Sequence, residues 1–142
     1  MSYKELFVKK IGFNECLDIL IEADNHFRLK GLVYPFNENK ERFFVIVDNE
    51  FAGFVSPRFE SYKWRLGAVY CKEKYRNTDY RFMERLINYV LDTIGKQNVF
   101  FELVDKDNYQ MKRLLEKTGF YFIANTHTNI EIWERQPYES RS

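Results

Sequence analysis

The sequence predicts a single α/β domain of the α+β kind, because helical and strand patterns are interspersed along a chain of domain size. Its 142 residues are enough for one hydrophobic core. Between residues 83 and 94, apolar side chains recur at the spacing of one buried helical face, and Gly95 follows as a stop signal. The apolar runs 43–47 and 51–55 flank a short polar turn, which indicates a β-hairpin.

The remaining elements follow from local signals in chain order. The first helix should bury a face that holds Leu17, Leu20 and Ile21, and Pro57 should end or bend the second strand of the hairpin. In order, we expect a strand at 4–11, a helix capped by Asn14, a short helix at 26–32, the hairpin, a strand at 64–71, the helix up to residue 94, a strand at 99–104, a helix capped by Asp107 or Asn108 and ended by Gly119, a closing hairpin of 120–124 and 130–133, and a mobile polar tail at 136–142.

Composition argues against several classes of protein. The 22 basic and 21 acidic side chains nearly balance, so nothing demands a polyanionic partner, and nucleic-acid binding through a basic edge is only a third hypothesis. Cys16 and Cys71 lack the spacing of a disulfide framework or a zinc site, and we expect reduced thiols and no metal. Because no signal peptide or membrane span is recognisable, we predict a cytoplasmic protein that does not enter a membrane.

Aromatic residues make up 18% of the chain, with 14 Phe and 10 Tyr. Such a share indicates either an aromatic-rich core or a surface that is used for binding. A homodimer is therefore one expectation.

The segment that joins the strand ending near Cys71 to the helix ending at residue 94 is a candidate phosphate site. A helix that begins directly after a strand directs its unpaired backbone N–H groups toward whatever leaves that strand. Asp79 is the expected N-cap of the helix. Basic residues gather around this point: Lys72, Lys74, Arg76, Arg81 and Arg85.

The same segment resembles the cofactor-binding segment of the GNAT N-acetyltransferases, in which a strand leads into an R-x-x-G-x-G/A loop and a helix. Tyr75 and Arg76 match the start of that motif, whereas its two glycine positions hold Asp79 and Arg81. The hairpin FFVIVDNEFAGFV is similar to the second and third strands of the family, with Gly53 at a common glycine. The segment DNYQMKRLLEKTGF resembles a further family motif through Asn108, Leu114, Glu116, Lys117, Gly119 and Phe120.

This resemblance implies a GNAT-like domain at 1–135 with a mixed, mostly antiparallel, twisted sheet flanked by helices. It also implies acetyl-CoA as the cofactor, with its pantetheine arm lying between a bulged fourth strand and a fifth strand that splays away from it. The end of the fourth strand, the loop after it and the last helix would then supply the cofactor contacts: Val69, Cys71, Arg76, Asn77, Thr78, Asp79, Tyr80, Arg81 and Asn108. Aromatic residues would line the acceptor pocket or pack in the core: Phe27, Tyr34 and Phe36.

The implied reaction is acetyl transfer to a primary amine of a small molecule or a protein, by direct attack in a ternary complex. Many family members use a tyrosine of the last helix as the acid, and Leu115 stands at that position. Glu102, Asp105 or His127 could act as the general base, although the favoured interpretation of Glu102 is a solvated strand residue and that of His127 is an exposed turn residue. Asp79 places a carboxylate where a diphosphate should rest. The alternative is a non-catalytic GNAT-fold module, an inhibitor or structural subunit, that binds a protein partner and no cofactor.

Overall fold

A computed structural model describes residues 7–32, 43–47, 50–76 and 81–137. These ranges contain seven strands and three α-helices, with 3-10 turns at Asn14–Cys16 and Glu73–Tyr75. In chain order the elements are β1 (Phe7–Ile11), α1 (Leu17–Leu29), β2 (Phe43–Val47), β3 (Phe51–Glu60), β4 (Lys63–Cys71), α2 (Phe82–Ile94), β5 (Phe100–Asp105), α3 (Tyr109–Lys117), β6 (Tyr121–Asn125) and β7 (Ile130–Arg135).

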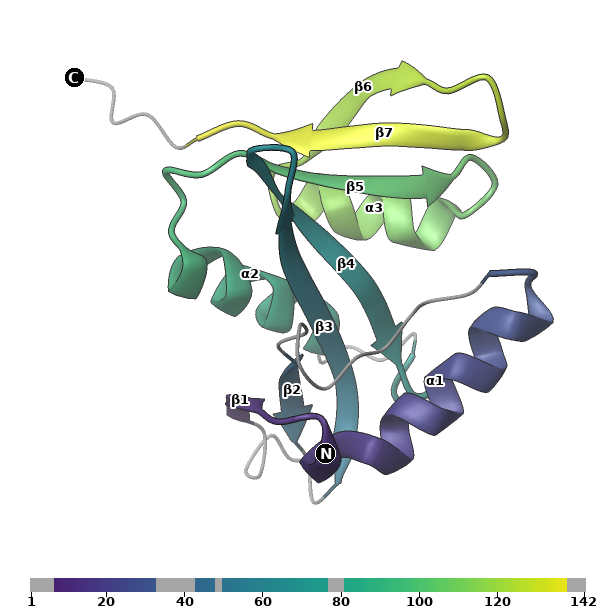
Figure 1. Ribbon diagram of the computed structural model, residues 1–142, viewed down its shortest axis with the longest axis vertical. Helices are drawn as coiled ribbons and strands as arrows, with labels where there is room; N and C mark the ends of the chain where they lie inside the picture. Colours follow the sequence, from purple (N-terminus) through teal and green to yellow (C-terminus); the bar gives the residue numbers. More distant parts are fainter. Residues whose placement is uncertain (1–6, 33–42, 48–49, 77–80, 138–142) are drawn as a thin grey trace.

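The seven strands form one sheet in the order β1-β2-β3-β4-β5-β7-β6 (Figure 1). Every neighbouring pair is antiparallel except β4 and β5, which run parallel. The predicted α+β class and the mixed, mostly antiparallel sheet are therefore confirmed.

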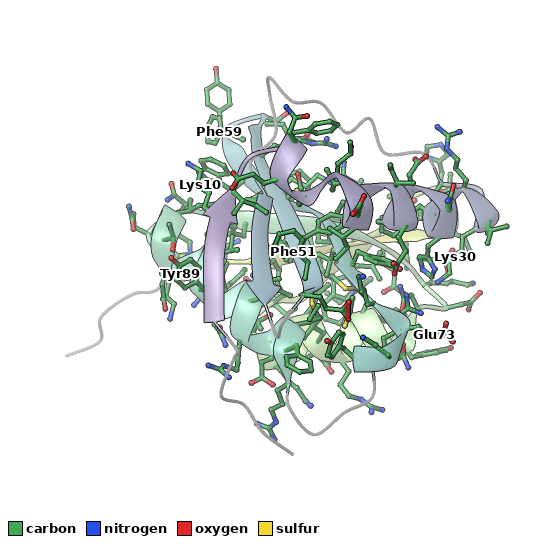
Figure 2. The ribbon with its side chains drawn as sticks, turned by 90° about the horizontal axis from the view of Figure 1, so that it is seen from below. Lys10, Lys30, Phe51, Phe59, Glu73 and Tyr89 are labelled. Carbon is green, nitrogen blue, oxygen red and sulfur yellow. The ribbon has the colours of Figure 1, made fainter. Side chains whose placement is uncertain are left out.

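Helices cover both faces of the sheet. On one face, α2 and α3 contribute Leu86, Leu91 and Leu115 to a core that also holds Val55 of β3. On the other face, α1 lies across the strands (Figure 2) and packs on a second core that includes Phe54. Because successive side chains of a strand point to opposite faces, the neighbours Phe54 and Val55 serve the two cores.

Helix α1 differs from the sequence expectation in its start, its extent and its buried face. It is one helix to Leu29, so the separate helix at 26–32 is wrong, and Asn14 begins a 3-10 turn and does not cap α1. Leu17 and Ile21 are 39% and 53% exposed. Leu20 is buried as expected, but its buried neighbours are Cys16, Ile19, Ala23 and Phe27. This stripe continues for three turns, whereas the expected stripe has no apolar continuation beyond Ile21.

The β3–β4 hairpin extends further than expected. Strand β3 runs through Pro57 to Glu60, and the β3–β4 register shifts between Ser56 and Arg58, so Pro57 bends the strand and does not end it. A two-residue turn, Ser61 and Tyr62, closes the hairpin, with φ values of 55° and 68°. Two left-handed residues are typical of a type I′ turn, which matches the twist of the strands.

Replacing Ser61 with Asn and Tyr62 with Gly should therefore stabilise the protein by about 1–2 kcal/mol, since these residues adopt positive φ at lower cost. The Tyr62 side chain is 93% exposed, so its removal costs little packing. Urea denaturation of the double variant measures the gain. Tyr62→Ala is the matched control, because it removes the ring without relieving the backbone, and an equal gain in Tyr62→Ala would contradict the explanation.

Candidate functional site

Strands β4 and β5 pair over a short length and then diverge. Their parallel ladder consists of Trp64 with Phe100 and Arg65 with Phe101. Beyond these pairs β4 continues to Cys71 and β5 to Asp105 without further pairing between the two strands. Figure 1 shows β4 and β5 separating toward their C-terminal ends. The β5-facing edge of the last half of β4 therefore carries backbone N–H and C=O groups that form no ladder with β5.

The divergence begins at a bulge in β4. In the pairing with β3, the single residue Pro57 lies opposite the two residues Leu66 and Gly67. Gly67 has φ 84°, and a Cβ atom at this position would lie 1.9 Å from the backbone oxygen of Ser56. Only glycine fits such a close approach with positive φ. The bulge turns β4 away from β5.

Glu102 lies where the two strands part. The residue is only 4% exposed, so the expectation of a solvated strand residue is wrong. Arg65 Nε lies 3.4 Å from its Oε1, and the backbone N–H of Leu103 donates to the same oxygen over 3.3 Å. The backbone N–H of Gly67 also donates to this carboxyl group. The bulge glycine, a strand arginine and Glu102 thus meet at one point of the sheet.

Burial raises the pKa of Glu102 from its ordinary value of 4.5 to about 7. The positive charge of Arg65 and the hydrogen bonds from Arg65, Leu103 and Gly67 favour the carboxylate and limit this rise. A carboxyl group with a pKa near 7 can accept a proton and release it again at neutral pH. Glu102 therefore has the environment of a general base, whereas Asp105 and His127 are exposed.

The end of β4 is held by contacts with α1 and with the turn after the strand. The Tyr70 hydroxyl donates to Glu22 Oε2 over 2.5 Å, and the Tyr70 ring contacts His26 edge-on. Arg76 donates from Nε to the backbone oxygen of Cys71 over 2.8 Å, and its guanidinium lies 5.5 Å from the centre of the Tyr70 ring. Burial raises the pKa of the Cys71 thiol to about 11, which leaves it a poor nucleophile.

Helix α2 begins at Phe82, and its N-cap is Arg81, not Asp79 as expected. Arg81 has φ 56° and makes no side-chain capping hydrogen bond. This left-handed conformation occurs where the GNAT motif has a glycine or alanine, and it is unfavourable for a side chain as large as arginine. Asn77, Thr78, Asp79 and Tyr80, which the resemblance assigns to the pyrophosphate loop, lie outside the described residues.

The basic group at this end of the sheet is partly neutralised by acidic side chains. Lys72 Nζ lies 3.6 Å from Glu22 and 3.7 Å from Glu50, and Lys74 also pairs with Glu50. The Arg81 side chain is more exposed than that of Lys72, and its Nε lies 4.0 Å from Glu84 Oε1. The expected cluster of basic residues is therefore interleaved with carboxylates, which weakens its field for a long polyanion such as a nucleic acid.

Helix α3 confirms the expected N-cap and adds a constraint on acid catalysis. Asn108 Oδ1 accepts a hydrogen bond from the Met111 backbone N–H over 3.1 Å. Its contact with a cofactor stays a prediction. Leu115 is fully buried, and a leucine side chain has no proton to donate. Phe27 is a core residue with 7% exposure, and Tyr34 and Phe36 lie outside the described part of the chain.

The resemblance implied a bulge in the fourth strand, but sequence reasoning missed its position at Gly67 and the contact of Arg65 with Glu102. The glycine inside the apolar strand WRLGAVYC was a signal for a bulge at Gly67. Arg65 and Glu102 are 37 residues apart in the sequence, so no local spacing could predict their contact.

The described ranges contain no cluster of three or more His, Cys, Asp or Glu side chains that could hold a metal ion. None of the described helices combines the length and the apolar character that crossing a membrane requires.

Several solved structures of acetyltransferases share this arrangement of helices and strands. The PaiA N-acetyltransferase of Thermoplasma acidophilum, solved with coenzyme A, matches with a TM-score of 0.73 and 17% identity over 96% of this chain and 99% of its own. The ribosomal-protein-S18-alanine N-acetyltransferase of Escherichia coli matches with a TM-score of 0.69 and 13% identity over 96% of each chain. An acetyltransferase of the GNAT family from Staphylococcus aureus matches with a TM-score of 0.65 and 14% identity over 93% of this chain and 100% of its own.

No protein-family model matches the sequence, and neither does any curated protein at a significant level. The structural matches cover nearly the whole chain, but fewer than one fifth of the aligned residues are identical. They therefore establish the fold and do not establish the activity. The strand order, the bulge in β4 and its divergence from β5 agree with the resemblance carried by the sequence motifs. This chain has the GNAT fold.

Proposed function

We propose that the protein is an acetyl-CoA-dependent N-acetyltransferase that acts on a primary amine of a small molecule or a protein. The observation that carries the proposal is the divergence of β4 from β5 at the Gly67 bulge, with the buried Glu102 at its apex. A cytoplasmic location fits the two free thiols, Cys16 and Cys71, since reduced cysteines are typical of that compartment.

The residues around the divergence fit an extended, anionic cofactor. The β4 edge from Val69 to Cys71 offers backbone groups to a linear arm in the manner of an added strand. The cations of Arg76 and Arg81 flank the segment between β4 and α2, where a diphosphate would lie. Arg76 is preorganised for this role, because Cys71 and the Tyr70 ring fix its guanidinium.

When bound, acetyl-CoA supplies an activated acyl group as a thioester. Glu102 would take a proton from the ammonium form of the acceptor, since only the neutral amine is a nucleophile. Arg65 and the backbone N–H groups of Leu103 and Gly67 hold the Glu102 carboxyl group in place. The tyrosine acid that many family members carry on the last helix has no counterpart at the matching position of α3, which Leu115 occupies.

The second candidate is a non-catalytic GNAT-fold module that binds a protein partner. Two observations favour it: Arg81 stands in a left-handed conformation where the motif has glycine or alanine, and Leu115 replaces the tyrosine acid. In this alternative the fold is retained and cofactor binding is lost. Direct measurement of CoA binding separates the two candidates.

Acetyl-CoA at about 100 times its Kd should raise the free energy of unfolding by about 2.7 kcal/mol, which thermal shift detects. Calorimetric titration with CoA should show Arg76→Gln binding about tenfold more weakly, because a charge-assisted contact to phosphate is lost. Arg113→Gln, at an exposed position of α3, is the matched control and should bind normally.

The absence of any thermal shift at millimolar acetyl-CoA would reject the enzyme proposal. Titrating Asp79→Gly and Arg81→Gly tests the alternative directly. Tighter CoA binding by these variants than by the parent protein would indicate that the parent loop has lost its affinity for the cofactor.

A further inference from the structure

Strand β6 presents an open, apolar edge of the sheet. It is the last strand in the sheet order and pairs only with β7 among the described strands. Figure 1 shows it along the outer margin of the β5–β7–β6 half. Tyr121, Phe122 and Ile123 are consecutive and are 47%, 45% and 42% exposed. Since consecutive strand residues point to opposite faces, apolar surface is exposed on both sides of this edge.

The two edges of the sheet differ in how they are protected. Edge strands of soluble monomers usually carry charges, especially lysine, that prevent pairing with another chain. Strand β1, at the opposite edge, has Lys9 and Lys10, and Figure 2 labels Lys10 there. Residues 118–130, which contain β6, include no Asp, Glu, Lys or Arg, although charged residues make up 30% of the chain. The β6 edge lacks such charges, and its protection is limited to a bulge-type shift in its pairing with β7 between Phe122 and Ala124.

We propose that β6 pairs antiparallel with β6 of a second copy of this chain, joining the two sheets across a two-fold axis. An axis at Ile123 places Phe122 opposite Ala124 of the partner and Tyr121 opposite Asn125 of the partner. Each ring then faces a smaller side chain, and no like charges meet. Such an isologous contact closes on itself and satisfies the outer backbone groups of both edges.

The charge pattern selects a second copy over a partner of another kind. A charged strand from another protein would leave its charges without partners along an edge that has none, which costs desolvation energy. The β6 strand of a second copy carries no charged residue either, so no charge is buried at any position along the paired strands. This inference does not depend on catalysis or on CoA binding, so it can fail while the proposed function holds.

Sedimentation equilibrium of the full chain tests the proposal. The wild type should sediment as a dimer of the 17.3 kDa chain, and Ile123→Lys should raise the dissociation constant about 100-fold, because two ammonium groups would be buried against each other. Tyr121→Lys provides a second variant in case Ile123→Lys fails to fold, which circular dichroism reveals. Leu29→Lys, at an 89% exposed position of α1, is the control and should remain dimeric.

A disulfide test checks the register. In a background with Cys71→Ser, oxidised Ile123→Cys should give a cross-linked dimer, because Ile123 faces itself across the axis. Asn125→Cys should not cross-link alone, but it should do so when mixed with Tyr121→Cys. A monomeric wild type at about 100 µM, or a dimer that Ile123→Lys leaves unchanged, would overturn the proposal. Efficient cross-linking of Asn125→Cys with itself would overturn the register.

Discussion

Glu102→Gln should lower kcat/KM for acetyl transfer by about 10²–10⁴-fold, the usual contribution of a general base. The amide keeps the shape of the carboxyl group and its contacts with Arg65 and Leu103, but it cannot take up a proton. Affinity for CoA should change little, since Glu102 is assigned no contact with the cofactor. Steady-state kinetics with an amine acceptor, together with CoA titration, separates the two effects.

The pH profile distinguishes catalysis from a structural role. The wild-type rate should rise as pH increases through about 7, where Glu102 loses its proton. Glu116→Gln, an exposed change on α3, is the control and should retain the wild-type profile. If Glu102→Gln retained both the rate and the pH dependence, Glu102 would be excluded as the base.

Stability should respond to pH in the opposite direction. Because the folded-state pKa of Glu102 lies above its ordinary value, the folded protein binds this proton more tightly than the unfolded chain does. Its contribution to stability is complete below pH 4.5 and is lost as pH rises to about 7, which amounts to about 3 kcal/mol. The stability of Glu102→Gln relative to wild type should therefore increase over that interval.

Gly67→Ala should destabilise the protein by about 3–5 kcal/mol, the range of severe core lesions. A Cβ atom at this position would lie 1.9 Å from the Ser56 oxygen, and that neighbour is backbone and cannot rotate away. The bulge must open, and with it the hydrogen bond from Gly67 to Glu102 is lost. Urea denaturation measures the loss, and CoA binding should weaken in parallel.

Gly31→Ala is the matched control, because Gly31 also has positive φ, 77°, but no atom lies within 4 Å of the added carbon. It should cost only the backbone strain, about 1 kcal/mol. Equal losses in both variants would show that φ alone matters and that the close approach at Gly67 does not.

The sequence was informative where one signal dominated. The α2 stripe continues from Phe82 to Leu91, and Asn108 is followed at once by a helical pattern, so both helices were predicted. In α1 two apolar stripes compete within the first turns, and tertiary packing against β3 and β4 decides between them. The N-cap of α2 was misplaced because Asp79 has the better side chain for capping, whereas the actual N-cap is Arg81, two residues later, and the helix begins at Phe82.

The candidate site was predictable only in part. In the sequence, Glu102 was one of several candidate bases, and nothing in its neighbourhood distinguished it from the others. Its burial depends on strands that meet only in the folded chain. The raised pKa arises from that burial and has no counterpart in the local sequence. Residues such as Glu22 and Tyr70, which are 48 positions apart, meet because α1 crosses the face of β4.

The short joint between β4 and β5 has a mechanical consequence. Every other pair of neighbouring strands is held by at least four residue pairs, whereas this joint has two. The β1–β4 meander and the β5–β7–β6 unit are connected mainly by apolar packing beneath α2, which tolerates sliding better than directional bonds do. A slight rotation of one unit against the other would thus widen the space between them without breaking a single backbone ladder.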